Sequence, residues 1–230
     1  MNKNIIIIIG AYGSGKSEYA INYAWQLHQK NIAVTLVDLD VVNPYFRSRQ
    51  VREDFARQDI LVIAPDGEYT HADLPMLSPR IMGAVQDVSR QPVLDVGGDP
   101  AGCRTLARYV ENINKRGYHL KVVINTRRPF TSDHQGIIKM LDSLEYTSRL
   151  KITELICNTN LMEYTDHDIV SEGIKIISGV AQERNLIFTE YLVMEKYEDK
   201  IPDGMLGKKR TLMQYYLNKP WEQSKVHGMI

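Results

Sequence analysis

The residues best suited to chemistry in this sequence lie between positions 10 and 17. They read Gly10-Ala11-Tyr12-Gly13-Ser14-Gly15-Lys16-Ser17 and fit the pattern G-x-x-x-x-G-K-[ST]. In such a loop, glycines let consecutive backbone N–H groups turn toward phosphate oxygens, and the helix that follows adds positive potential. The pattern predicts that Lys16 reaches the β and γ phosphates of a nucleotide and that the Ser17 hydroxyl binds Mg²⁺. We therefore assign this phosphate loop, with Glu18 directly after it, to nucleotide binding.

Three aspartates are candidates for the metal side of this site. Asp95 ends an apolar run and precedes a glycine-rich stretch at residues 97–102, while Asp38 and Asp40 end another apolar run. Carboxylates at strand ends beside a phosphate loop can hold Mg²⁺ and its water shell. The glycines would let backbone approach the γ-phosphate and then move, which predicts a nucleotide-sensing switch. The alternatives are a plain strand-to-helix turn at 97–102 and an aspartate that only turns the chain.

Apolar runs separated by helix-length stretches must position these motifs. The first run, Ile5 to Ile9, has five consecutive isoleucines and is typical of a central strand buried on both faces. Six further runs lie at residues 32–37, 60–63, 92–96, 120–124, 152–157 and 186–188. This rhythm predicts an α/β fold: a three-layer, doubly wound, mainly parallel sheet of about seven strands with helices on both faces. We expect a single domain over residues 1–230, with a C-terminal tail helix from about residue 205.

The composition argues against several other classes of protein. Hydrophobic residues make up 43% and charged residues 24%, which is typical of a globular chain rather than a disordered one. The 28 basic residues cancel the 28 acidic ones, so nucleic acid is not an expected partner. Cys103 and Cys157 have no Cys or His at metal-ligand spacing, which argues against zinc and against a disulfide framework. The isoleucine run is too short to span a membrane and no cleavage site follows it, so we expect a cytoplasmic protein.

The combined motifs resemble the MinD/ParA branch of the SIMIBI class of P-loop ATPases. The resemblance rests on the phosphate loop, the V-D-x-D at residues 37–40 and the distal aspartate, and it spans roughly residues 5–194. It implies that Asp40 orients the attacking water, that Asp38 lies near the metal, and that Asp95 holds the Mg²⁺ water shell. It also implies that Asn158 reads adenine. Because the guanine-reading tetrapeptide Asn-Lys-x-Asp is missing, ATP is preferred over GTP.

The sequence departs from this family at position 11. Ala11 stands where the family carries a signature lysine that reaches across a nucleotide-sandwich dimer. Either another cation completes the site, with Arg47, Arg49, Arg127 and Arg128 as candidates, or the dimer does not form in that way and hydrolysis is slow.

Two segments near the expected site combine aromatic and basic residues. Residues 43–49 contain Tyr45 and Phe46, which are either interface anchors presented in one nucleotide state or core residues under the loop. Residues 127–133 follow the fifth apolar run, at the sheet edge where open α/β sheets bind ligands. They bind a partner or an anion, or they cap a helix that starts near Thr131.

These features leave three functions open. The first is a Mg²⁺-dependent ATP-hydrolysing switch, with Lys16 and Asp40 as catalytic residues and a protein partner or homodimer as its target. The second is a P-loop kinase for a small molecule or nucleotide, with a pocket over residues 69–80. The third is a nucleotide-binding module with little hydrolysis, which Ala11 suggests. The basic and apolar tail at residues 208–217 fits packing onto the domain better than it fits contact with a membrane.

Overall fold

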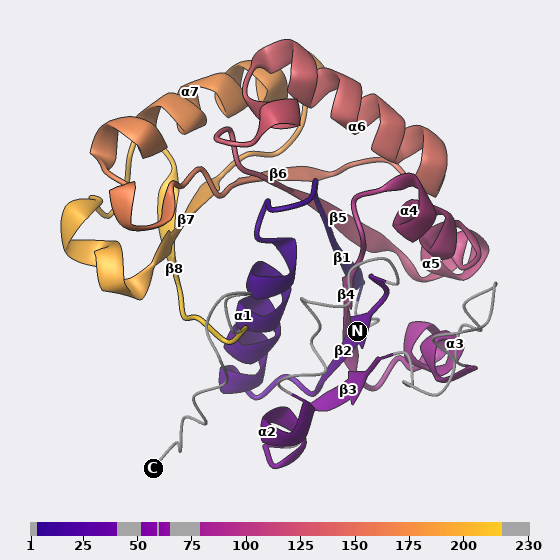
Figure 1. The fold of residues 1–230 in the computed structure, drawn as a ribbon. Helices are drawn as coiled ribbons and strands as arrows, with labels where there is room; N and C mark the ends of the chain where they lie inside the picture. The colour runs from indigo at the N-terminus through magenta and orange to yellow at the C-terminus, as the bar shows by residue number, and fades with distance from the viewer. Residues whose placement is uncertain (1–3, 41–51, 59, 65–78, 218–230) are drawn as a thin grey trace.

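The computed structural model describes residues 4–40, 52–58, 60–64 and 79–217. These residues form one eight-stranded sheet in the order β3-β2-β4-β1-β5-β6-β7-β8, and every neighbouring pair is parallel (Figure 1). The strands are β1 (Ile5–Ile9), β2 (Val34–Asp38), β3 (Leu61–Ile63), β4 (Gln91–Asp95), β5 (Tyr118–Ile124), β6 (Glu154–Cys157), β7 (Glu190–Met194) and β8 (Lys209–Met213). The predicted α/β class is confirmed.

The isoleucine strand β1 lies inside the sheet, between β4 and β5. Its register places Ile6 beside Val93 of β4 and beside His119 of β5. Side chains alternate along a strand, so Ile5, Ile7 and Ile9 face one side of the sheet and Ile6 and Ile8 the other. Both faces of β1 are therefore buried, and none of its five isoleucines is more than 7% exposed.

Helices cover both faces, which confirms the three-layer expectation. On one face, α1 (Lys16–Gln29) and α2 (Arg52–Ala56) pack on the smaller hydrophobic cluster. The other face carries α3 (Pro79–Gln86), α4 (Pro100–Ala107), α5 (Val110–Arg116), α6 (His134–Ser148) and α7 (His167–Arg184). Figure 1 shows α1 on the side of the sheet opposite α6 and α7. Short 3₁₀ helices lie at Pro129–Thr131, Met162–Tyr164 and Glu195–Lys200.

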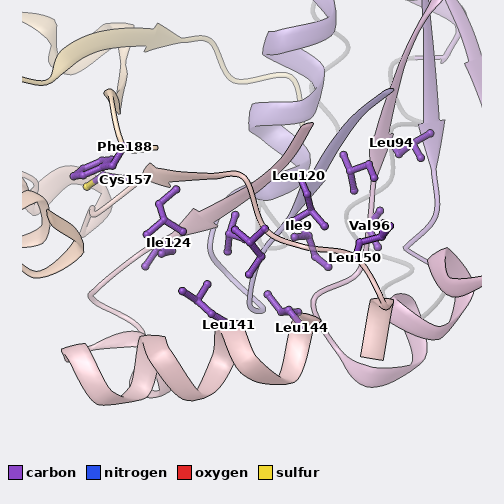
Figure 2. Packing of buried hydrophobic residues seen from close by; sticks show 14 of the residues in the cluster. Ile9, Leu94, Val96, Leu120, Ile124, Leu141, Leu144, Leu150, Cys157 and Phe188 are labelled. Atoms are coloured by element: carbon purple, nitrogen blue, oxygen red, sulfur yellow. The ribbon is translucent and has the colours of Figure 1, made fainter. Parts of the chain in front are cut away.

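The larger cluster joins the strands to α6. In Figure 2, Leu141 and Leu144 of α6 point toward Ile9, Leu120 and Ile124 of the sheet. All five side chains are at most 4% exposed. This packing fixes the carboxyl ends of β1 and β5, and the loops that leave those ends carry several of the predicted site residues.

The C-terminal part of the sheet differs from the prediction in two ways. The tail helix expected from about residue 205 is wrong, because residues 209–213 form strand β8, parallel to β7. Leu212 and Met213 fit a helical face as well as a strand, and the pairing with β7 decides between them. The run at 186–188 is not a strand either: it makes one isolated bridge, from Ile187 to Glu154, and β7 begins at Glu190. Hence the sheet has eight strands instead of about seven.

The stretch between the apolar runs at 92–96 and 120–124, which is long enough for one helix, forms two. α4 ends at Ala107 and α5 starts at Val110, and Gly117 ends α5 with a φ of 86°. Among the described residues, no helix combines the length and the apolar character that a membrane span requires.

Candidate functional site

The phosphate loop connects β1 to α1 and adopts the backbone that its glycines allow. Gly13 and Gly15 have φ angles of 74° and 87°, in the left-handed region that L side chains avoid. A turn closes the loop where Ser14 N donates to Ala11 O at 3.0 Å. Gly15 is the N-cap of α1 and brings no side chain to cap it. The loop therefore leads directly into the positive end of a 14-residue helix.

Lys16 lies at the start of this helix and forms a buried ion pair. Its Nζ is 2.9 Å from Asp40 Oδ2, and the two side chains are 9% and 3% exposed. Burial lowers the pKa of Lys16, but Asp95, Asp40 and Asp38 together raise it above the usual 10.5. The ammonium therefore stays charged in the folded protein. The sequence predicted separate roles for Lys16 and Asp40 and did not predict this contact.

The two strand-end aspartates lie side by side in the sheet. Asp38 of β2 is in register with Asp95 of β4, and Asp40 N donates to Asp38 Oδ1 at 3.1 Å. Burial raises the pKa of Asp95 to about 6, although the nearby Lys16 ammonium and Ser17 hydroxyl lower it. All three predicted aspartates are at most 2% exposed, so the structure gathers them with Lys16 in one buried polar site.

Two groups of this site fit a magnesium ion. Ser17 Oγ and both oxygens of Asp95 are buried, and within the described ranges none of them has a hydrogen bond of good geometry. Burying such groups without partners is costly, and a cation satisfies them. The described residues contain no group of three or more His, Cys, Asp or Glu side chains that could hold a metal alone. Mg²⁺ commonly uses one or two carboxylates and completes its shell with phosphate oxygens and water.

The predicted switch segment, the glycine-rich residues 97–102, lies against the phosphate loop. A Cβ on Gly98 would lie 1.9 Å from Gly10 O, a distance that no side chain can occupy. A Cβ on Gly97 would lie 3.0 Å from Asp40 Oδ1, so the Asp40 side chain lies between Lys16 and this segment. The segment is closed by Gly102 N, which donates to Asp99 Oδ1 at 3.1 Å. A displacement at Gly98 would therefore act directly on the phosphate loop.

Asn158 reaches the same loop from the end of β6. Its Nδ2 donates to Ser14 O at 2.7 Å, and the residue is 6% exposed. A Cβ on Gly15 would lie 2.2 Å from this nitrogen, so only glycine lets the amide come so close. Asn160 Nδ2 donates to Asn158 O at 2.8 Å and supports the turn.

The turn after β5 contains a buried residue that supports the candidate site and that the sequence analysis missed. Asn125 is 1% exposed and links two loops: its Oδ1 accepts from Arg127 N at 2.9 Å, and its Nδ2 donates to Asn160 O at 3.2 Å. An asparagine directly after a buried strand was the available signal.

Of the four candidate cations, Arg127 pairs with Glu172, whereas Arg128 Nε donates to Gly13 O at 3.1 Å.

Glu18 binds the C-terminal segment of the chain. Its carboxylate accepts hydrogen bonds from the backbone N–H groups of Tyr216 and Leu217, and burial raises its pKa to about 7. One helical turn later, Asn22 and Gln214 exchange two hydrogen bonds of 2.8 and 2.9 Å. The tail up to residue 217 thus packs on α1, as the sequence favoured.

Other predictions concern residues outside the described ranges. The proposed contact surface at 43–49, with Tyr45 and Phe46, lies there together with the candidate cations Arg47 and Arg49. Most of the kinase pocket considered over residues 69–80 lies there as well.

Comparisons with known proteins bear on the fold. No protein-family model matches the sequence, and a comparison with curated proteins gives no match. Among solved structures, FtsY from Thermotoga maritima matches with a TM-score of 0.56 and 18% identity over 86% of this chain and 64% of that chain. FtsY from Mycoplasma mycoides matches with a TM-score of 0.55 and 15% identity, over 82% and 59% of the two chains.

A third structure is a nucleotide-binding protein from Archaeoglobus fulgidus in complex with ADP. It matches with a TM-score of 0.50 and 10% identity, over 82% of this chain and 80% of that chain. This chain covers less than two thirds of either FtsY chain. At these identities the likeness concerns the fold, which is the α/β fold of P-loop NTPases.

Proposed function

We propose that this protein is a Mg²⁺-dependent molecular switch of the SIMIBI class, similar to MinD and ParA, that binds and slowly hydrolyses ATP. The observation that carries the proposal is the buried ion pair between Asp40 and Lys16, the residue at which the phosphate loop leads into α1. A lysine at this position of the motif binds phosphate, and here a carboxylate occupies its ammonium group. Nucleotide binding then exchanges one anion for another.

This exchange gives each residue of the pair a role. When phosphate oxygens take the place of Asp40 at Lys16, the Asp40 carboxylate is released beside Gly97 of the switch segment. From there it can orient the water that attacks the γ-phosphate. Losing a group that positions or deprotonates the attacking water slows a reaction by about 10²–10⁴-fold.

Mg²⁺ would be held by Ser17 and Asp95, with Asp38 beside them, and it would supply positive charge to the phosphate oxygens. Lys16 and the phosphate loop then bind and orient the phosphates, and the switch segment senses them through its contact at Gly98. Because neither oxygen of Asp95 has a hydrogen bond of good geometry within the described ranges, a cation at this place would satisfy the buried carboxylate, which supports metal binding.

The preference for ATP rests on Asn158. Its amide can pair a donor with a ring nitrogen of adenine and an acceptor with the exocyclic amine, and its contact with Ser14 O brings it to the loop. The chain has no Asn-Lys-x-Asp tetrapeptide to read guanine. The complex of the Archaeoglobus fulgidus protein with ADP is in line with an adenine nucleotide.

Slow turnover and a protein partner or second copy complete the proposal. Ala11 cannot supply the cation that the family's signature lysine provides, so hydrolysis by the isolated chain should be slow. A molecular switch acts by binding or releasing a partner in one nucleotide state. The partner would contact the surfaces beside Asp40 and Gly98, because a bound nucleotide would change their conformation.

The test compares Lys16→Ala with Lys30→Ala, two lysine substitutions near opposite ends of α1. Calorimetry with ATP and ADP in Mg²⁺ should show binding by the wild-type protein and by the control, because Lys30 is exposed at the far end of the helix. Lys16→Ala should weaken ATP binding by about 100-fold or more, as expected for a lost charge-assisted contact. Unchanged binding by Lys16→Ala would refute the phosphate-loop assignment. GTP bound as tightly as ATP, or no turnover of ATP, would refute the finer parts of the proposal.

A further inference from the structure

Arg128 lies beside the phosphate loop on a turn that the chain holds firmly. Its backbone N–H donates to Asn125 O at 3.2 Å, and its carbonyl accepts from Thr131 N at 3.0 Å. Thr131 Oγ1 also donates to Asn125 O, at 2.7 Å. Asn125 and Thr131 are each 1% exposed, so the turn is anchored to the core. The Arg128 side chain is therefore projected from a fixed base.

Within the described part of the chain, one nitrogen of the side chain forms a hydrogen bond. Nε donates to Gly13 O at 3.1 Å, and a Cβ on Gly13 would lie 3.0 Å from that nitrogen. The residue is exposed, and no carboxylate of the described ranges forms an ion pair with it. The neighbouring Arg127, in contrast, is paired with Glu172. Arg128 is thus an exposed cation that lies beside Gly13 and that no carboxylate of the described ranges neutralises.

The hydrogen bond to Gly13 O indicates which side of the loop Arg128 occupies. A phosphate loop turns its N–H groups inward to the phosphates, so a carbonyl bonded to a side chain marks the outer side. Asn158 binds the next carbonyl of the loop, Ser14 O. Arg128 therefore lies near the predicted base-reading residue and outside the phosphate cradle.

The sheet order separates the two ends of a bound nucleotide. Asp38 and Asp95 stand on β2 and β4, on one side of β1, whereas Arg128 and Asn158 follow β5 and β6 on the other side. A nucleotide whose γ-phosphate points to the carboxylates directs its nucleoside toward β5 and β6. Arg128 is thus placed at the nucleoside end and away from the γ-phosphate.

We infer that the Arg128 guanidinium forms one wall of the nucleobase site and stacks on the base, an inference that rests on the proposed function. Arginine suits this position because its cation is planar and delocalised and stacks on aromatic rings, while its Nε can keep a separate hydrogen bond. Lysine would keep the charge and lose the flat face.

The experiment measures dissociation constants of ADP, ATP and inorganic pyrophosphate by calorimetry for wild type, Arg128→Ala and Arg128→Lys. Arg127→Ala is the matched control, because that arginine is adjacent in sequence and pairs with Glu172 instead. Both Arg128 variants should bind ADP and ATP about 5- to 30-fold more weakly, the range of a stacked cation. Pyrophosphate affinity should stay within about twofold of wild type for all variants, because pyrophosphate has no base to stack on the guanidinium. ATP turnover at saturation is measured in parallel, to separate a loss of binding from a loss at the reacting phosphate.

Each other outcome overturns the inference. Equal loss of ADP and pyrophosphate would make Arg128 a phosphate ligand, and slower turnover with unchanged ADP affinity would place it at the γ-phosphate. Unchanged affinities would leave it a purely structural residue, and a full rescue by lysine would show that charge alone matters. A wild-type protein that binds pyrophosphate but no nucleotide would remove the base site. If the wild type binds none of the three ligands, the proposed function itself fails.

Discussion

The contact between Gly98 and the phosphate loop predicts that Gly98→Ala damages both stability and nucleotide binding. The added Cβ would lie 1.9 Å from Gly10 O, 2.4 Å from Gly10 C and 3.0 Å from Ala11 N. All three are backbone atoms, so no flexible side chain can move aside. The loop or the switch segment must shift by about 1 Å or more to restore ordinary contact.

The cost follows from the size of this overlap. Inserting a methyl group into closely packed structure costs about 1–3 kcal/mol, and a clash with rigid backbone belongs at the upper end. For a chain of this length, about 3 kcal/mol corresponds to a melting temperature lower by about 6–12 °C. The displaced Gly10 would also misplace the loop N–H groups, and we expect ADP affinity to fall by about tenfold or more.

Gly83→Ala is the matched control for this substitution. Gly83 lies within α3, and a Cβ added there meets no atom within 4 Å. Alanine is favoured over glycine in a helix, so the control should be more stable than wild type by about 0.5–1 kcal/mol. Thermal unfolding without nucleotide and calorimetry with ADP measure both effects. If Gly98→Ala unfolds at the wild-type temperature and binds ADP normally, the switch segment does not contact Gly10 as described.

Three further predictions concern the site and its surroundings. Asp40→Ala should keep ATP binding and lose about 100-fold or more of the turnover measured by phosphate release, and wild-type turnover would disprove the water-orienting role. In the folded protein the pKa of Glu18 is raised to about 7, so the native state holds a proton that the unfolded chain releases above about pH 4.5. The stabilisation by Glu18 is thus present below pH 4.5 and is lost as pH rises to 7. Glu18→Gln should therefore reduce the change in the free energy of unfolding between these pH values, measured by urea unfolding, and an unchanged pH dependence would contradict the prediction. Asn158→Ala should weaken the binding of ADP and reduce the preference for ATP over GTP in competition binding. An intact preference would assign Asn158 a purely structural role at Ser14 O.

The sequence predicted the parts of the site that depend on local signals. The glycines and Lys16 define a loop by their spacing alone, and the isoleucines before them define a buried strand. Asp38 and Asp95 were recognisable because each ends an apolar run, and parallel strands bring their carboxyl ends to one edge. The structure then places these two aspartates in register with each other.

Other features depend on strand order and could not be predicted in this way. The Lys16–Asp40 pair and the approach of Arg128 to Gly13 both join segments that meet only once β2, β4, β1 and β5 take their places. The prediction of a helix in place of strand β8 failed for a related reason. Only two of its five residues, Leu212 and Met213, are apolar, and such a short pattern fits either a helix or a strand. The pairing with β7 makes these residues a strand, and a local sequence pattern does not predict that pairing.

The order in which the chain is synthesised gives the position of β1 a further consequence. This strand is made before its partners, which include Val93 of β4 and Leu120 of β5. In the same way, α1 is made before Glu190, which accepts from Tyr19, and before Tyr216, which donates to Glu18. Contacts so distant in sequence are slow to form and leave apolar surface exposed meanwhile. A nascent chain therefore carries five uncovered isoleucines until β5 has been made, and α1 gains its contact with Tyr216 only after all eight described strands have been made.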